Sequence, residues 1–431
     1  MKRTTFAFFA CALAAFAARA ETVAIVGGKV HTLGRAGTLE PATVLIRDGR
    51  IEAVGTNLKV PAGATVIDAA GKVVTPGFMD AYGRLGVQEI ELEDSTTDFS
   101  MKNPRFGAAF SVADAINPRA SKILVNRIEG LTRAAVVPAS ESFGENGLGN
   151  VISGQGVVIH LGGTREFLVR SPAAIFAVYG EEGAALAGGA RGAALLVLRE
   201  ALADARDYGM NRAAFEQRAR RDYALSRLDL EALQPLLRGE IPLVVEVHRA
   251  ADIEAVLKLA REFGIRLVIA GGAEAWLVAD RLAAANVPVI IDPAENLPSR
   301  FEMLGATLEN AARLHAAGVM VAFATEDAAN PRNIRQLAGN AVAHGMPYEA
   351  ALAALTVNPA RIYGVAGAYG ALEAGKDADV VIWSGDPLEV TTFAEAVFVK
   401  GRPLPMRSRQ TLLRDRYKEL DEPMPQAYDK P

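Results

Sequence analysis

The sequence predicts an α/β fold: a TIM-like (β/α)8 barrel joined to a small β-sandwich domain that both chain ends form. From Pro76 onward, Val-rich runs alternate with segments of helical period, which is typical of parallel strands covered by helices. The runs that end at His248, Ala270 and Ile291 recur at nearly equal intervals, which favours a closed barrel. Both chain ends instead show short strands separated by turns, so we expect one β module split across them.

Composition places the chain among globular proteins. It has 431 residues, of which 50% are hydrophobic, and a mean hydropathy of +0.16, which excludes a disordered chain. A single cysteine excludes a disulfide-stabilised scaffold. The length accommodates one barrel of roughly 250–300 residues and a smaller domain. Because the net charge of −4 gives no basic field, we expect no nucleic-acid partner.

Residues 1–20 have the pattern of a signal peptide. Lys2 and Arg3 form a positively charged start, and an apolar run follows over 6–18. That run is too short to span a bilayer, and the small residues after it form a cleavage site, which predicts cleavage after Ala20. We therefore expect an exported protein, periplasmic or secreted, whose mature form has no membrane span.

The first part of the predicted β-sandwich covers residues 21–75. Its Val- and Ile-rich runs lie at 22–26, 42–46 and 51–54. Asp48 and Gly49 stand between two of these runs, and an Asp-Gly pair in that place is a strong signal for a tight β-hairpin turn. We therefore expect a small antiparallel β module before the barrel.

The barrel is predicted to occupy residues 76–358. The apolar runs expected to form its later strands end at Val137, His160, His248, Ala270, Ile291 and Ala324. Helical period marks 253–263 and 274–285, and the Ala- and Arg-rich segment 181–239 is expected to form two or three helices. Barrel enzymes carry their reacting groups at the carboxyl ends of the strands, so polar residues there are the functional candidates.

After the barrel the chain returns to short strands and turns. Residues 359–404 form the predicted second part of the β-sandwich, with strands at 378–383 and 396–399. A single module with a barrel inserted into it accounts for this pattern better than two unrelated end domains. Residues 405–431 are polar and contain prolines near their end, so we expect a C-terminal tail.

Five motifs follow one another in a characteristic order. They are VTPGFMDAYGR (74–84), IPLVVEVHRAADI (241–253), GGAEAW (271–276), TVNPARIYG (356–364) and GALEAGKDADVVIW (370–383). Together they resemble the amidohydrolase superfamily, and most of all the imidazolonepropionase-like amidohydrolases. Because the motifs span essentially the whole chain after the signal peptide, the resemblance is more specific than any one of them.

The resemblance implies a hydrolase that acts on carbon–nitrogen bonds other than peptide bonds, in small cyclic amide-like substrates. In the superfamily a divalent metal such as zinc, held by His-x-His on strand one, histidines on strands five and six and an aspartate on strand eight, activates water. In this sequence the His-x-His pair falls on Tyr82 and Arg84, and the strand-six histidine falls on Gly271 or Gly272. His248 matches the strand-five ligand.

The superfamily's strand-eight acid falls on Glu326 or Asp327, and the sequence does not decide between them. One imidazole and one carboxylate are fewer ligands than a catalytic zinc site uses, and Arg84 is a permanent cation at a ligand position. We therefore predict no tightly bound metal there and no confidently assigned cofactor. Arg84 would instead pair with the strand-eight acid or bind a ligand carboxylate, while Tyr82 would supply a hydroxyl donor.

The predicted site thus has Glu326 or Asp327 as the catalytic acid, with the pocket residues Tyr82, Arg84, His248 and Glu274. Glu274 has an alternative role, because a carboxylate near a helix N-terminus is stabilising without catalysis. The alternative for His248, which the surrounding motif makes the weaker one, is a core histidine at a strand end. Two functions remain open: a hydrolase with a reduced or relocated metal site, and a catalytically silent relative that binds a small ligand or partner in the barrel mouth. The superfamily often forms dimers or larger assemblies, which leaves a homo-oligomer open.

Overall fold

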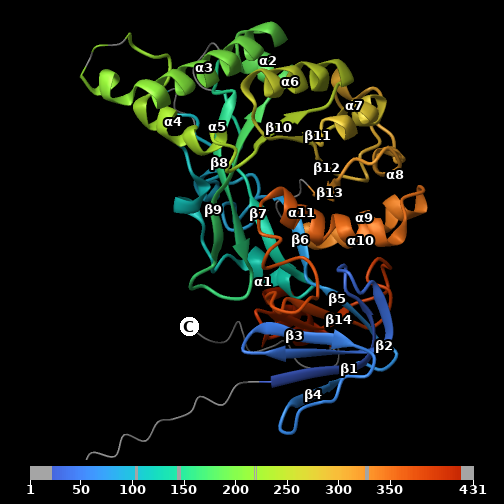
Figure 1. Ribbon diagram of the computed structural model, residues 1–431. Helices are drawn as coiled ribbons and strands as arrows, with labels where there is room; N and C mark the ends of the chain where they lie inside the picture. The colour runs from blue at the N-terminus through green and yellow to red at the C-terminus, as the bar shows by residue number, and fades with distance from the viewer. Residues whose placement is uncertain are drawn as a thin grey trace, which may run out of the picture.

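The computed structural model describes residues 22–101, 105–142, 147–217, 219, 221–325 and 330–418. These residues form two eight-stranded sheets, shown in Figure 1 with the helices that cover the first of them. The first sheet is a nearly closed barrel and the second is built from both ends of the chain, so the predicted fold class is confirmed. In Figure 1 the second sheet lies on one side of the barrel, and the helices α2, α3 and α6 lie on the opposite side.

The barrel strands follow one another around the sheet in chain order. They are β6 (Phe78–Gly83), β7 (Leu131–Val136), β8 (Ile152–His160), β9 (Leu168–Val178), β10 (Leu243–Val247), β11 (Leu267–Gly271), β12 (Val289–Ile291) and β13 (Val321–Phe323). The last strand lies beside the first, which nearly closes the barrel. Alternate residues of each strand point inward, so Met79, Val244 and Val268 pack together in the barrel interior.

Two features of the barrel differ from the prediction. The strand β9 was not foreseen, because its first half is partly exposed and contains Pro172. The strand β8 runs antiparallel to both of its neighbours, β7 and β9, rather than parallel to them. The cause is the short connection over 161–167, because parallel neighbours need a crossover of a dozen or more residues and this one has room only for a hairpin.

The helices lie where the sequence placed them, with differences in detail. Helix α6 (Ala250–Phe263) buries the apolar face that Ile253, Val256 and Leu257 predict, and it ends at Gly264, whose left-handed backbone favours glycine. The segment 181–239 forms four helices rather than two or three: α2 (Glu181–Leu186), α3 (Arg191–Glu216), α4 (Arg227–Ala232) and α5 (Gln234–Leu237). The expected helix 274–285 is a 3₁₀ turn followed by α7 (Ala279–Ala284).

The remaining helices complete the cover of the barrel and extend past the second sheet. They are α1 (Ser121–Arg127), α8 (Asn310–Ala316), α9 (Ile334–Ala343), α10 (Tyr348–Ala354), α11 (Val357–Ile362) and α12 (Arg409–Tyr417). Helix α12 lies in the segment expected to be a tail. Its formation has a local cause, because Ser408 and Thr411 form a reciprocal capping box at its start.

The second sheet combines strands from the two chain ends. The first end supplies β1 (Thr22–His31), β2 (Thr38–Arg47), β3 (Arg50–Gly55), β4 (Thr65–Asp68) and β5 (Val73–Pro76), and the second supplies β14 (Val380–Trp383), β15 (Ala394–Val399) and β16 (Arg402–Pro403). The two ends meet where β5 pairs with β14. Hydrogen bonds join all eight strands in one branched sheet, with β4 as the branch on β1. Asp48 and Gly49 make the predicted hairpin turn between β2 and β3.

A buried ion cluster joins the barrel to the second sheet. Arg133 of β7 is fully buried, and its Nε and Nη2 donate to Asp379 at 2.9 Å and to Asp377 at 2.6 Å. Its guanidinium also lies 4.5 Å from the ring centre of Tyr369. The two aspartates directly precede β14, so this cluster fixes the position of the second sheet against the barrel strand β7.

No helix of the described residues is both long and apolar enough to cross a membrane. Residues 1–20, on which the signal peptide was predicted, lie outside the part of the chain that the structure describes. Export and cleavage after Ala20 therefore stay predictions from the sequence.

Candidate active site

The barrel mouth is the end of the barrel where the parallel strands finish, and a tyrosine and a glutamate meet inside it. Tyr82, near the end of β6, donates its hydroxyl hydrogen to Oε2 of Glu246 on β10, at 3.1 Å. Glu246 lies two residues after Val244 on β10, so the two side chains point to the same face of the strand. Because Val244 lies in the barrel interior, Glu246 points inward too. The Tyr82 ring packs edge-on against Phe176, with 5.8 Å between ring centres.

His248 directly follows β10 and lies in the same mouth, as the motif predicted. Its side chain is buried, and its Nε2 lies 4.0 Å from Oε1 of Glu246. Burial acts to raise the pKa of the Glu246 carboxyl, but the contacts with His248 and Tyr82 outweigh it and hold that pKa below its ordinary value. Glu246 is therefore an ionised carboxylate with a hydroxyl on one side and an imidazole on the other.

Arg300 brings a positive charge into this group from the loop after β12. Its Nη2 lies 3.1 Å from Nε2 of His248 and 3.9 Å from Oε1 of Glu246. Its Nη1 lies 3.7 Å from a carboxylate oxygen of Glu182 and 3.7 Å from one of Glu302. One guanidinium thus lies among three carboxylates, and Arg191 supplies a second cation 3.5 Å from Glu302.

Glu182, at the start of α2, completes the rim of the mouth. Burial raises the pKa of its carboxyl, and the charge of Glu246 raises it further, while Arg300 and Arg84 oppose the shift. Glu302 is almost fully buried, and its Oε2 accepts the backbone N–H of Glu181 at 2.6 Å. Glu302 therefore anchors the start of α2, which holds Glu182 toward the mouth.

Arg84 lies close enough to the mouth for its charge to lower the pKa of Glu182. Its guanidinium carbon stacks 3.9 Å from the ring centre of Phe99, a cation–π contact. The predicted catalytic acids Glu326 and Asp327 lie outside the described residues, so the proposed pairing of Arg84 with one of them stays a prediction.

The sequence missed several residues of this site, and one signal could have found most of them. Glu182 follows β9, Glu246 is the next-to-last residue of β10, and Asp292 directly follows β12. Each therefore stands at the carboxyl end of a barrel strand, the position of functional groups in such barrels. Burial raises the pKa of Asp292 to about 6. Arg300 carries no such signal, because it lies in a loop well beyond its strand.

Glu274 lies beside the site but has structural contacts. Its Oε2 accepts the backbone N–H of Ala250, at the start of α6, at 3.0 Å, and its Oε1 accepts the N–H of Gly305 at 3.2 Å. The carboxylate therefore caps the neighbouring helix α6. The sequence instead predicted that it stabilises the helix that Glu274 itself begins, which is a 3₁₀ turn.

We expect Glu274→Ala to lower the free energy of unfolding by about 1 to 2 kcal/mol, because two backbone N–H groups lose their acceptor. Urea denaturation of the purified protein measures this. Glu309→Ala is the matched control: Glu309 is exposed and pairs with Arg313 one helical turn away, so its loss should cost less than about 0.5 kcal/mol. Equal losses in the two variants would show that Glu274 caps nothing.

Comparison with known proteins agrees with this architecture. A model of the amidohydrolase family matches residues 204–404. A solved amidohydrolase structure from Thermotoga maritima superposes with a TM-score of 0.80 at 28% identity, and the match covers 89% of this chain and 100% of that one. The comparison thus shows an amidohydrolase-family domain over residues 204–404. The curated relatives described next match over less than half of their own length.

Amidohydrolase tasK of Hapsidospora irregularis is 25% identical over 398 residues, which are 83% of this chain but only 39% of tasK. An imidazolonepropionase of Vibrio cholerae is 29% identical over 114 residues, which are 24% of this chain and 28% of that protein. The chain thus spans about two fifths of tasK. The similarity to these relatives does not by itself assign an activity or a substrate to this chain.

The described residues at the positions of the superfamily's metal ligands do not fit a metal ion. At the strand-six position, Gly271 has a φ of +79°, and a Cβ there would lie 2.5 Å from Cε1 of His248. The Nε2 of His248 faces the Arg300 guanidinium instead of a cation site. Among the described residues no group of three or more His, Cys, Asp or Glu side chains is arranged to hold a metal. The described side chains at these positions therefore form a hydrogen-bonded network and do not form a set of metal ligands.

Proposed function

We propose that this chain is a hydrolase of carbon–nitrogen bonds other than peptide bonds in small cyclic amide-like molecules, and that the barrel mouth is its reaction site. The observation that carries the proposal is the meeting of Tyr82, Glu246 and His248 at the ends of β6 and β10. Barrel enzymes place their reacting groups at this face. The match to the amidohydrolase family model over residues 204–404, and the likeness to a solved amidohydrolase, support the reaction class.

In the proposed reaction Glu246 is the general base. It takes a proton from a water molecule as the water oxygen attacks the amide carbonyl carbon, and the carbonyl oxygen becomes an oxyanion. Arg300, which lies 3.9 Å from Glu246, is placed to stabilise that negative charge. When the carbon–nitrogen bond breaks, Glu246 returns the proton to the leaving nitrogen. Hydrolysis opens the ring, so the product is one molecule that carries both a carboxylic acid and an amine.

Turnover of lactams, hydantoins and N-acyl amino acids by the purified chain, with its metal content measured in parallel, tests this proposal. We expect hydrolysis of one or more of the cyclic members of the panel, at a rate that a chelator does not change, because the described mouth residues do not fit a metal. If removal of a stoichiometric metal abolished the activity and its addition restored it, the role given to Glu246 would be overturned. Inactivity on the whole panel would overturn the hydrolase assignment.

The contact between Arg300 and His248 favours a second candidate, a family member that binds a ligand without turnover. The 3.1 Å approach of Nη2 to Nε2 occupies the imidazole nitrogen, while Arg84 and Arg300 offer two cations to an anionic group. A carboxylate-bearing ligand would then bind by charge-assisted hydrogen bonds. Calorimetric binding of N-acyl amino acids by a chain that does not hydrolyse them would favour this candidate.

A further inference from the structure

A large cavity lies at the opposite end of the barrel from the mouth. Its volume is about 650 Å³, and its lining includes Pro242, Pro288 and Met320, which directly precede β10, β12 and β13. These residues mark the amino ends of the strands, so the cavity is separated from the mouth by the length of the barrel. Cavities of this volume accommodate a small organic ligand.

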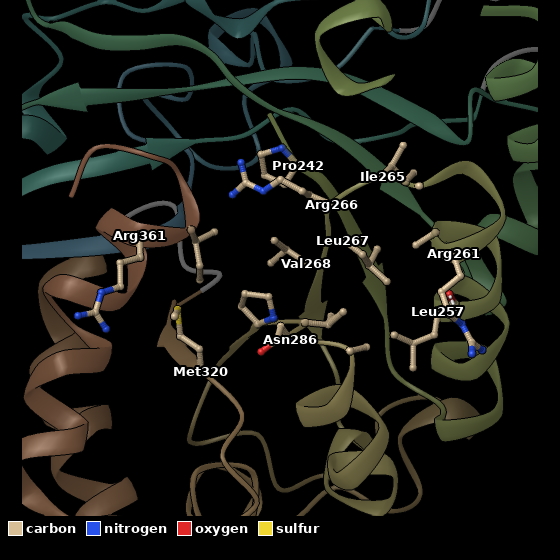
Figure 2. A pocket seen from close by; sticks show the side chains of 16 residues that line it. Pro242, Leu257, Arg261, Ile265, Arg266, Leu267, Val268, Asn286, Met320 and Arg361 are labelled. Carbon is tan, nitrogen blue, oxygen red and sulfur yellow. Dashed lines mark hydrogen bonds between the residues drawn. The ribbon is translucent and has the colours of Figure 1, made fainter. Parts of the chain in front are cut away.

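The wall of this cavity is apolar, and the charges around it have one sign. Val268, Leu267 and Met320 supply apolar side chains, and the prolines at the strand starts offer no backbone N–H group. Arg261, Arg266 and Arg361 also line the cavity, and none of its described lining residues is an aspartate or a glutamate. Figure 2 shows Arg361 on one side and Arg261 on the other, with Val268 between them.

The cavity continues as a groove along the helices. A second hollow of about 460 Å³ lies along α6 and α7 and shares Leu257, Arg261 and Ala285 with the first. Its rim carries Lys258 and Arg281, and its glutamate, Glu254, is paired with that arginine. The two hollows therefore adjoin one another at Leu257, Arg261 and Ala285, and positive side chains outnumber negative ones around them.

We propose that this groove binds a medium-chain alkyl carboxylate, with the alkyl chain against the apolar wall and the carboxylate at one of the arginines on its edge. Charge complementarity selects an anion, because three arginines and no carboxylate surround the first hollow. The apolar wall of the first hollow and the space that adjoins it favour a ligand with a flexible hydrocarbon body over a compact polar anion. The site is separate from the barrel mouth and does not depend on the function proposed there.

Titration of the full chain with decanoate, below its micelle concentration, by isothermal calorimetry tests the proposal. We expect Ala285→Trp, which fills the space shared by the two hollows from an exposed position, to weaken binding by more than about tenfold. Arg266→Gln and Arg361→Gln should each weaken it by about two- to fivefold. Arg35→Gln, at an exposed arginine of the second sheet, should leave it unchanged.

A parallel titration with decyltrimethylammonium separates charge recognition from unspecific apolar binding. We expect the cation to bind at least about tenfold more weakly than decanoate, because the rim carries the same charge. Equal binding of the two surfactants, full decanoate binding by Ala285→Trp with unchanged circular dichroism, or no decanoate binding at all would each overturn the proposal.

Discussion

Replacement of Arg133 by methionine is expected to lower the free energy of unfolding by about 3 to 5 kcal/mol. The guanidinium is fully buried between the barrel and the second sheet, and Asp379, which it contacts at 2.9 Å, is also buried. Removal of the cation leaves a buried carboxylate without its counter-charge, which costs far more than the loss of an exposed pair. Urea denaturation followed by circular dichroism measures the change.

Arg47→Met provides the control for this variant. Arg47 pairs with Glu52 at 3.1 Å, but the two side chains are 46% and 34% exposed, so water screens the interaction. Its removal should change the free energy of unfolding by less than about 1 kcal/mol. If Arg133→Met lost no more stability than Arg47→Met, the buried cluster would not be what fixes the second sheet on the barrel.

Replacement of Glu246 by glutamine is expected to reduce kcat by about 100-fold or more, because the amide cannot accept the proton of the attacking water. Glutamine has nearly the same size and can still accept the hydrogen bond from Tyr82, which is 3.1 Å away in the native chain. The variant should therefore keep its fold and much of its substrate affinity. Steady-state kinetics with the most reactive substrate of the amide panel measure kcat and KM separately.

Glu240→Gln is the matched substitution away from the mouth. Glu240 lies on the surface, where it pairs with Arg238, and both side chains are exposed. This variant should hydrolyse the same substrate at the rate of the unmodified chain. Undiminished kcat in Glu246→Gln, with an intact fold, would exclude Glu246 as the general base.

The sequence predicted the fold class because its signals are local. Val-rich runs, helical periods and the Asp48-Gly49 turn each depend on residues that are neighbours in the chain, and the structure confirms the barrel and the sheet from both chain ends. The strand β9 was missed because its first half faces solvent and so lacks an apolar run. The antiparallel direction of β8 was missed with it, since the direction depends on the length of the connection to β9.

The site was only partly predictable for a related reason. Tyr82 and His248 were found because a motif fixes their places on β6 and after β10. Glu182 could not be placed without β9, and Arg300 reaches the mouth from a loop in which nothing in the local sequence indicates its direction. Contacts between residues so far apart in the chain depend on how the loops pack, which no local pattern specifies.

The glycine at position 271 also constrains how this chain could change over evolutionary time. A histidine there would have to adopt a left-handed backbone and occupy space that the ring of His248 already fills. Tyr82 and Arg84 stand at two further positions where the superfamily resemblance implies imidazoles. A four-imidazole site could therefore arise here only through several coordinated replacements together with a movement of the His248 ring.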